Sequence, residues 1–324
     1  MARALALAEA AWGTTAPNPA VGCGLVVDGL AIGEGATAPG GRPHAEAAAL
    51  AQAGERARGA TAYVTLEPCA HDSPRGPACA DLLIVAGVAR IVVAVPDPDP
   101  RTNGQGIARL RAAGIAVELD DGADRARAIV AGFAYRIAHG RPRVTLKLAL
   151  SIDGRIALGD GTSRWITGEA ARAHAHLERA RADLIVVGRG TLEADDPVLD
   201  VRLPGEAHRS PRPAILSRTL RAAPSGSRLA ARDPLILRAP GDVDALGINE
   251  VLVEGGAGTA TAFLAANRVD RLLVYRAPLM LGGDARSSIG ALDLTELASA
   301  HGRWRRVSLK DLGADLLEVY ERIV

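Results

Sequence analysis

The sequence is poor in several residue types, and each shortage excludes a class of protein. Aromatic residues make up only 3% of the 324 residues, and the formal net charge is +1. Nucleic-acid-binding surfaces need basic stripes with interleaved aromatic residues, and anionic membranes attract segments of positive charge. We therefore expect no nucleic-acid partner and no membrane partner. Any anionic ligand must be bound by local charges.

Long apolar runs and cysteine pairs are also missing. No stretch reaches the roughly 18 uncharged apolar residues that a membrane helix needs, and the longest candidate, residues 81–96, contains Arg90. Glu9 interrupts the apolar start MARALALAEA, which argues against a signal peptide. The three cysteines, Cys23, Cys69 and Cys79, cannot all pair. We expect a cytoplasmic protein whose cysteines are buried or bind a metal.

Helical and strand patterns alternate along both halves of the chain. Helical patterns cover residues 2–12, 45–59 and 168–183, and strand patterns cover residues 20–29, 31–37, 60–68, 144–150 and 271–281. The segment AHGRPR, residues 138–143, separates the halves with glycine and proline. This order predicts an α/β fold in two domains, residues 1–140 and 144–324.

The stretch GRPHAEAAAL places His44 and Glu46 where a loop gives way to a helix. Taken alone, the pair also fits an ordinary helix start, because Glu46 favours the positive end of the helix dipole. Downstream, Cys69 follows a strand and Cys79 begins a helix, a position that favours thiolate. One histidine and two cysteines with an open fourth position are typical of a catalytic zinc site.

The same residues form the zinc-deaminase signature, an H-x-E followed by Pro68-Cys69 and a second cysteine. Zinc lowers the pKa of a bound water from about 15.7 to about 7. Glu46 is then expected to pass the proton of the water to a ring nitrogen and to the leaving amine. An amino-pyrimidine is the natural electrophile. Cys23 lacks a ligand partner at motif spacing and is expected in the core, whereas His71 fits a substrate contact and a loop histidine equally well.

The motifs APNPAVGCGLVV, PHAE, TAYVTLEPCAH, KLALSIDGRIA, SRWITG, LEADDPVLDVR and VEGGAGTATAFL occur in one order along the chain. Together they resemble the bifunctional deaminase and reductase family of riboflavin biosynthesis. The resemblance implies a cytidine-deaminase-like three-layer α/β/α domain followed by a dihydrofolate-reductase-like α/β domain. It also implies that Asn18 contacts a phosphoribosylamino-pyrimidine substrate. The chain departs from the family in having nine residues, where eight are usual, between Cys69 and Cys79. We expect the ligands to survive this change.

The second half has no G-x-G-x-x-G after its first strand, so no Rossmann site is indicated. By resemblance, VEGGAGTATAFL wraps the phosphates of NADPH at a helix start. The implied NADPH contacts are Ala149, Trp165, Thr191, Asp195, Ser217, Gly256, Ala257, Gly258, Thr259, Ala260, Thr261 and Ala262. The implied substrate contacts are Ser163, Arg179, Leu199, Arg202 and Glu254. Arg179 and Arg202 suit the phosphate because arginine binds phosphate through charge-assisted hydrogen bonds.

Other interpretations stay open at this level. The first half could deaminate a different amino-pyrimidine or a nucleoside, and the second half could be a non-catalytic nucleotide-binding or dimerisation module. A homodimer is expected from the resemblance alone. Lys147, one of two lysines in the chain, lies near the expected reductase pocket together with Asp153. Neither residue has an assigned role, and the role of Asp99 is also open.

Overall fold

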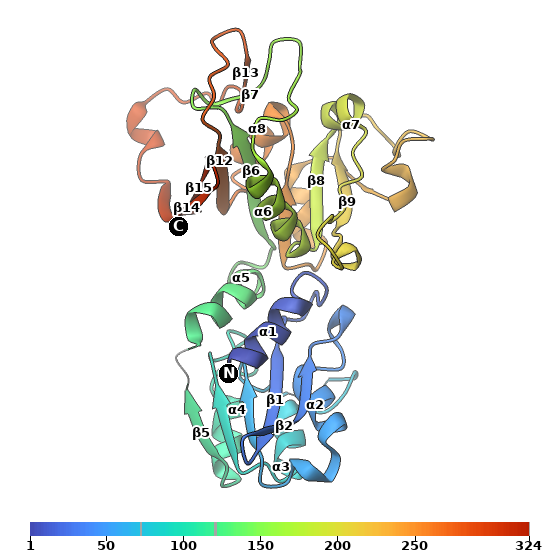
Figure 1. Cartoon of the computed structure of the whole chain (residues 1–324), viewed down its shortest axis with the longest axis vertical. Coiled ribbons are helices and arrows are strands. Elements are labelled where there is room, and N and C mark those ends of the chain that lie inside the picture. Colours follow the sequence, from blue (N-terminus) through green and yellow to red (C-terminus); the bar gives the residue numbers. More distant parts are fainter. Residues whose placement is uncertain (72, 120–121, 324) are drawn as a thin grey trace. The chain divides into compact units, whose positions relative to one another are not determined.

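The computed structural model describes residues 1–71, 73–119 and 122–323 (Figure 1). The chain divides into two compact units, Met1–Gly140 and Arg141–Val324, here called the first and second unit. The boundary falls inside AHGRPR, where Gly140 ends a helix with a φ of 69°. Asp72, within the span between the two ligand cysteines, and Val324, the end of the second expected domain, lie outside the described residues.

The first unit contains a five-stranded sheet in the order β2-β1-β3-β4-β5. β1 pairs antiparallel with β2 and β3, whereas β3, β4 and β5 run parallel. The strands are β1 (Gly22–Val27), β2 (Leu30–Ala36), β3 (Thr61–Val64), β4 (Arg90–Val93) and β5 (Ala116–Leu119). The helices are α1 (Ala2–Ala11), α2 (Ala45–Ala53), α3 (Cys79–Val85), α4 (Gln105–Ala112) and α5 (Ala123–His139).

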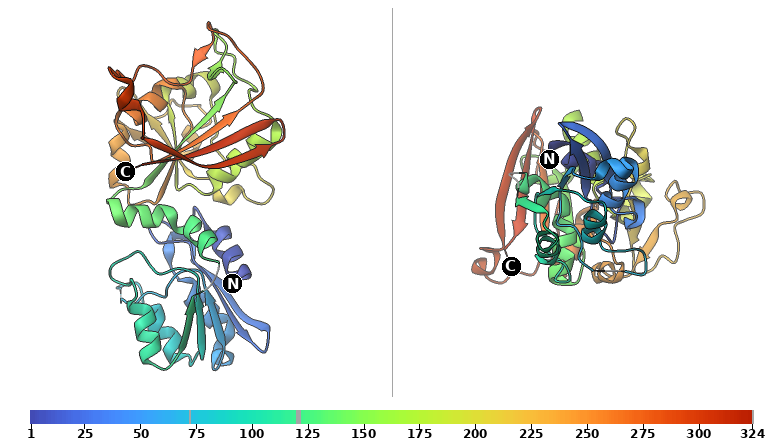
Figure 2. Two further views of the ribbon diagram at one scale, coloured as in Figure 1. Left: turned by 90° about the vertical axis from the view of Figure 1, so that its left-hand side faces the viewer. Right: turned by 90° about the horizontal axis from the view of Figure 1, so that it is seen from below.

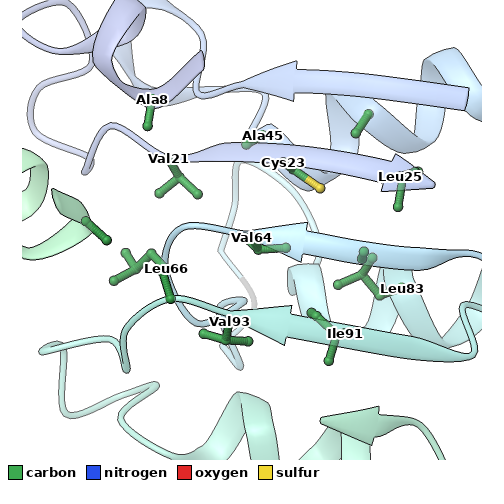
Figure 3. Packing of buried hydrophobic residues seen from close by; sticks show 14 of the residues in the cluster. Ala8, Val21, Cys23, Leu25, Ala45, Val64, Leu66, Leu83, Ile91 and Val93 are labelled. Atoms are coloured by element: carbon green, nitrogen blue, oxygen red, sulfur yellow. The ribbon is translucent and has the colours of Figure 1, made fainter. Parts of the chain in front are cut away.

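Glycines let two of these helices approach opposite faces of the sheet closely. A Cβ added at Gly22 would lie 1.9 Å from the Ala4 carbonyl oxygen of α1, and one at Gly35 would lie 2.3 Å from the Ala45 carbonyl oxygen of α2. The three-layer arrangement expected for this unit is therefore confirmed (Figure 2). Cys23 is fully buried in the apolar core around β1, β3 and β4 (Figure 3), as expected.

The second unit is built on an eight-stranded sheet in the order β10-β9-β8-β11-β6-β12-β15-β14. The strands from β10 to β12 are parallel, and β15 runs antiparallel to β12 and β14. The strands are β6 (Arg143–Leu150), β8 (Leu184–Gly188), β9 (Arg212–Leu216), β10 (Leu235–Leu237), β11 (Glu250–Val253), β12 (Arg271–Arg276), β14 (Trp304–Leu312) and β15 (Asp315–Arg322). A small separate sheet joins β7 (Arg155–Ala157) to β13 (Arg286–Ser287). The helices are α6 (Glu169–Ala180), α7 (Arg189–Asp195) and α8 (Ala257–Ala265).

Strand residues alternate between two apolar clusters on the faces of this sheet. On β12, Leu273 and Tyr275 pack with Ala171 and Ala175 of α6, whereas Val274 belongs to the cluster that contains Phe263 of α8. Six neighbouring parallel strands place their carboxyl ends along one edge, where open α/β sheets bind ligands. None of the helices in the described parts of the chain has the length and apolar character needed to cross a membrane.

Three predicted elements end at least four residues earlier than expected, and one of them is the strand predicted over residues 60–68, which ends at Val64. The helix predicted over residues 45–59 ends at Ala53, because Gly54 adopts a φ of 58°, and only a short 3-10 turn, Gly54–Ala57, follows. The strand predicted over residues 271–281 ends at Arg276. Pro278 has no N–H for a sheet hydrogen bond, so the strand cannot continue through it.

Candidate active sites

Three element ends bring the predicted metal ligands together in the first unit. His44 lies at the N-cap of α2, Cys79 is the first residue of α3, and Cys69 lies in the loop after β3. The Nδ1 atom of His44 is 3.3 Å from the Cys79 Sγ and 3.7 Å from the Cys69 Sγ, and all three ligand atoms lie within 4.8 Å of one another. Two sulfurs and one imidazole nitrogen suit zinc and leave a fourth position for a reacting water.

The nine-residue span between the cysteines does not separate them. The backbone N–H of Cys79 donates to the Cys69 Sγ at 3.2 Å, and the N–H of Ala80 donates to the Cys69 carbonyl at 3.1 Å. Hydrogen bonds from the side chain of Cys79, and then from His44, lower the pKa of the Cys69 thiol. The start of α3 thus favours a thiolate at Cys69, whereas the side-chain hydrogen bond with Cys69, and then burial, raise the pKa of Cys79.

Asn18 lies against the ligand histidine. Its Nδ2 is 2.9 Å from the Nε2 of His44 and 3.0 Å from the Gly41 carbonyl oxygen. If Nδ1 binds a metal, Nε2 carries the proton, and Asn18 must then turn its amide oxygen toward it. A second partner of this kind fixes the orientation of a metal-binding imidazole. The substrate contact expected for Asn18 stays a prediction.

Glu46 lies in the first turn of α2 and is 3% exposed. Burial, and then the negative charge of Cys69, raise the pKa of Glu46 to about 7. A carboxyl group that gains and loses a proton near neutral pH is suited to proton transfer.

Sequence reasoning missed Glu67, which organises the segment of residues 97–107. Its buried carboxylate accepts hydrogen bonds from the backbone N–H groups of Asp97, Gly104 and Ile107 at 3.1, 2.9 and 3.0 Å. Burial raises the pKa of Asp97 to about 7. Asp99 forms an ion pair with Arg101, so its carboxylate is already engaged.

His71 lies on the same side of the first unit as this loop. Its Nδ1 is 3.3 Å from the Thr102 Oγ1. Its function, whether substrate contact or loop support, stays open.

The second unit has a cavity of about 1330 Å³ at the carboxyl ends of its parallel strands, here called the strand-end cavity. Its wall includes Leu148 and Ala149 of β6, Gly188 of β8, Ser217 after β9 and Tyr275 of β12. This volume is ample for a dinucleotide and a second small molecule. The position agrees with the general rule for ligands of open α/β sheets.

Most of the predicted NADPH contacts line this cavity. Those that do are Ala149, Trp165, Thr191, Asp195, Ser217, Gly256, Ala257, Gly258, Thr259 and Ala262. Gly256 caps α8, and its N–H donates to the Thr191 Oγ1 at 3.3 Å. Within the glycine-rich segment, Ala260 is fully buried in the core, and the Thr261 Oγ1 accepts a hydrogen bond from the Gly290 N–H. These two residues do not line the cavity.

The predicted substrate contacts Ser163, Arg179, Leu199, Arg202 and Glu254 also line the strand-end cavity. Arg179 forms a bidentate ion pair with Glu254, with Nε–Oε1 and Nη2–Oε2 distances of 2.7 and 2.9 Å. The charge of Arg179, opposing the effect of burial, lowers the pKa of Glu254 to about 2. Leu199 adopts a φ of 58°, a conformation that side chains of this type rarely adopt.

Lys147 lies beside this ion pair, with its Nζ 3.9 Å from the Glu254 Oε2. Burial lowers the pKa of Lys147. Asp153 has a different position: it accepts hydrogen bonds from Ser151 Oγ, Leu281 N and Gly282 N at 2.6, 3.1 and 2.8 Å. Asp153 therefore ties a loop to the end of β6.

Two polar cavity residues of α6 were not predicted. Arg172 lies with its Cζ 4.7 Å from the centre of the Trp165 ring, and His176 lies against Arg202. A signal for both was present in the sequence, because positions 172, 176 and 179 repeat at the spacing of one helical face.

The fold and the two sites define a class of protein, a zinc-type deaminase unit joined to a reductase unit with a dinucleotide cavity. Two family models match these parts. The one described as the zinc-binding region of cytidine and deoxycytidylate deaminases covers residues 1–95, and the one described as the RibD C-terminal domain covers residues 142–317.

Whole-chain relatives agree. The riboflavin biosynthesis protein RibD of Escherichia coli is 40% identical over 98% of this chain and 96% of its own length, and that of Haemophilus influenzae is 39% identical over 99% and 96%. The structure of Acinetobacter baumannii RibD has a TM-score of 0.85 at 37% identity, covering 100% of this chain and 98% of its own. That of the Thermotoga maritima deaminase and reductase has a TM-score of 0.84 at 29% identity, covering 100% and 97%.

The chain belongs to the RibD family. It is a bifunctional deaminase and reductase of riboflavin biosynthesis, and zinc and NADPH are the cofactors of the two activities. A second half that serves only as a binding or dimerisation module is not favoured, because the match to the RibD C-terminal domain extends over most of the second unit.

Proposed function

We propose that residues 1–140 deaminate diaminohydroxyphosphoribosylaminopyrimidine and that residues 144–324 reduce the ribosyl chain of the resulting uracil to a ribityl chain. The cluster of His44, Cys69 and Cys79 around buried Glu46 carries the first assignment. The strand-end cavity, lined by ten expected cofactor contacts and five expected substrate contacts, supports the second.

In the deaminase unit, zinc held by His44, Cys69 and Cys79 would supply a Lewis acid that activates water. Glu46 accepts one proton of that water and delivers it to the ring nitrogen, and it then moves the second proton from the added hydroxyl to the amino group, which leaves as ammonia. Its raised pKa allows it to hold the proton between these steps. Asn18 contacts the substrate or orients His44, and both uses fit its position between Gly41 and His44.

In the reductase unit, NADPH supplies the hydride for the sugar carbon. Gly256, Ala257 and Gly258 lie at the N-terminus of α8. Backbone N–H groups at a helix N-terminus suit the phosphates of a dinucleotide. Arg202 and Arg179 are proposed to face the phosphate of the substrate. Glu254, which is held by Arg179, is proposed to face the ribosylamino part. This unit positions the donor and acceptor carbons next to each other.

The test is an assay of zinc-loaded protein with the diaminopyrimidine ribosyl phosphate, followed by mass with and without NADPH. We expect an amino group to be replaced by oxygen without NADPH, and two hydrogens to be gained when NADPH is added. Deamination alone would overturn the reductase assignment. An unchanged mass under both conditions would overturn the substrate assignment.

We further propose that the enzyme acts in the cytoplasm as a homodimer without a nucleic-acid partner. Three free cysteines, two of them at the metal cluster, suit a reducing compartment. The near-zero net charge gives no electrostatic attraction for nucleic acid. Light scattering during gel filtration measures the oligomeric state, and a monomeric mass at micromolar concentration would contradict the dimer.

A further inference from the structure

His176 makes a contact that its hydrogen-bonding groups cannot satisfy. Its Nδ1 lies 3.3 Å from the backbone nitrogen of Arg202, and its Nε2 lies 3.3 and 3.2 Å from the Nε and Nη2 of the same residue. All three nitrogens of Arg202 are donors without a lone pair. A neutral imidazole has one acceptor nitrogen and one N–H. Whichever ring nitrogen carries the proton, its N–H group therefore points at an N–H group of Arg202.

Protonation does not relieve this conflict. An imidazolium has two N–H groups, so both ring nitrogens would then oppose donors. Burial, and then Arg179 and Arg202, lower the pKa of His176, against the opposite effects of Glu254 and Asp200. The lowered pKa favours the neutral ring. In either protonation state, the contact between His176 and Arg202 lacks an acceptor.

Two nearby protein acceptors, the Glu254 carboxylate and the Asp200 carbonyl, are already engaged. Both carboxylate oxygens of Glu254 accept from Arg179, and the carbonyl oxygen of Asp200 accepts from the Arg179 Nη1 at 3.0 Å. The carboxylate of Asp200 lies 3.7 Å from the Arg202 Nε, beyond hydrogen-bond distance. His176 and Arg202 both line the strand-end cavity, and the Arg202 side chain is 59% exposed. An acceptor can therefore reach them from the cavity.

We propose that His176 binds the phosphate group of the reductase substrate as a neutral donor, together with Arg202. In this arrangement, Nδ1 accepts from the Arg202 backbone N–H, and Nε2–H donates to one phosphate oxygen. The guanidinium of Arg202 binds another oxygen. The dianion, the main form of a phosphate ester at neutral pH, has only acceptor sites. One such anion resolves the conflict when the exposed Arg202 side chain turns from His176 Nε2 toward it. The substrate's identity rests on the proposed function, whereas the anion site rests on the contacts of His176.

The experiment compares His176→Leu with His176→Gln, whose amide offers an acceptor and a donor. His208→Leu is the control, since His208 is exposed and bonds only to the Gly205 carbonyl among the contacts described. Binding of D-ribose 5-phosphate is measured by calorimetry, and reductase kinetics are measured with phosphorylated and dephosphorylated substrate.

For His176→Leu we expect about 10-fold weaker ribose 5-phosphate binding and a similar rise in KM for the phosphorylated substrate, with kcat nearly unchanged. The dephosphorylated substrate is expected to show no such rise. His176→Gln should recover most of the binding, and His208→Leu should equal the wild type. Deaminase activity and the unfolding temperature verify that each variant is folded.

Several results would overturn the proposal. Unchanged ribose 5-phosphate binding in His176→Leu would show that His176 does not bind the phosphate. An equal KM rise for the dephosphorylated substrate would show the same. Weaker NADPH binding with normal ribose 5-phosphate binding would assign His176 to a cofactor phosphate instead. If wild type reduces neither substrate, the proposed function fails, but the ribose 5-phosphate titrations still decide the anion site. Failure of the wild type to bind ribose 5-phosphate would also overturn the proposed anion site.

Discussion

Glu46 and Glu254 are two buried carboxyl groups whose surroundings move their pKa in opposite directions. Glu46 lacks a cationic partner strong enough to offset burial, so its pKa rises to about 7, whereas Arg179 holds the pKa of Glu254 near 2. The difference comes from the neighbours, because both side chains are removed from water. Glu46 can exchange a proton at neutral pH, and Glu254 stays an anion while its ion pair with Arg179 is intact.

Glu46→Gln tests the proton-transfer role. Gln fits the same volume but cannot carry the proton, so we expect deamination to fall by about 10²- to 10⁴-fold. Zinc content, measured by atomic absorption, and reductase activity should match the wild type. A variant that keeps more than a tenth of the deaminase rate would contradict the role assigned to Glu46.

Glu178 is a buried carboxylate that stabilises the second unit. It accepts hydrogen bonds from Arg271 and Arg181 at 2.7 and 2.8 Å, and these cations lower its pKa to about 2 against the effect of burial. Because the folded pKa lies below the unfolded value, the stabilisation is complete above the unfolded pKa. It is lost as pH falls toward the folded pKa.

We therefore expect Glu178→Gln to lose about 3 kcal/mol of unfolding free energy at pH 7. The difference from wild type should shrink from about pH 5 downward. Urea unfolding of the second unit at several pH values measures this. A difference that does not change with pH would show that lost packing, and not lost charge, causes the effect.

At the scale of elements, α2 positions the site through its close packing on β2. A Cβ at Gly35 would lie 2.3 Å from the Ala45 carbonyl oxygen, directly beside His44 and Glu46. Gly24 on β1 offers a matched control, because a Cβ there meets nothing within 4 Å. The first turn of α2 therefore depends on the absence of a side chain on the neighbouring strand.

Gly35→Ala should displace the start of α2 and cost about 1–3 kcal/mol of stability. We expect weaker zinc binding and lower deaminase activity, while Gly24→Ala stays close to the wild type in both. Competition with a chelator measures the zinc affinity. Equal behaviour of the two variants would contradict this role of Gly35.

Most elements could be predicted because their apolar periodicity is local. The cluster of His44, Cys69 and Cys79 was also predictable, since these residues occur at motif spacing. The role of Glu67 was not predictable, because its hydrogen-bond partners at residues 97–107 are distant in the sequence and come close only in the folded chain. Helix α7 was not predicted either, because seven residues starting with Arg-Gly give too short a pattern. His176 was missed because its proposed role depends on its contact with Arg202, and Arg202 lies in a loop that is distant from α6 in the sequence.

At the scale of the whole molecule, the two activities use separate units with separate cofactors. Across the described ranges, His44, Cys69 and Cys79 form the one cluster of three or more ligating side chains, and it belongs to the first unit. Chelation should therefore abolish deamination and leave NADPH-dependent reduction intact. Assays of both steps before and after dialysis against a chelator measure this, with zinc restored as the control. Loss of both activities would mean that the units depend on each other.

The position of Lys147 in the strand-end cavity gives this molecule a built-in reporter. The chain's other lysine, Lys310, lies exposed on β14. An amine-acylating reagent can therefore modify two side chains and the amino terminus, which keeps the mass spectrum simple. NADPH or the substrate should slow acylation of Lys147 and leave that of Lys310 unchanged. Counting acyl groups on the intact protein then measures occupancy of the reductase site without a chromophore, a turnover or an engineered label.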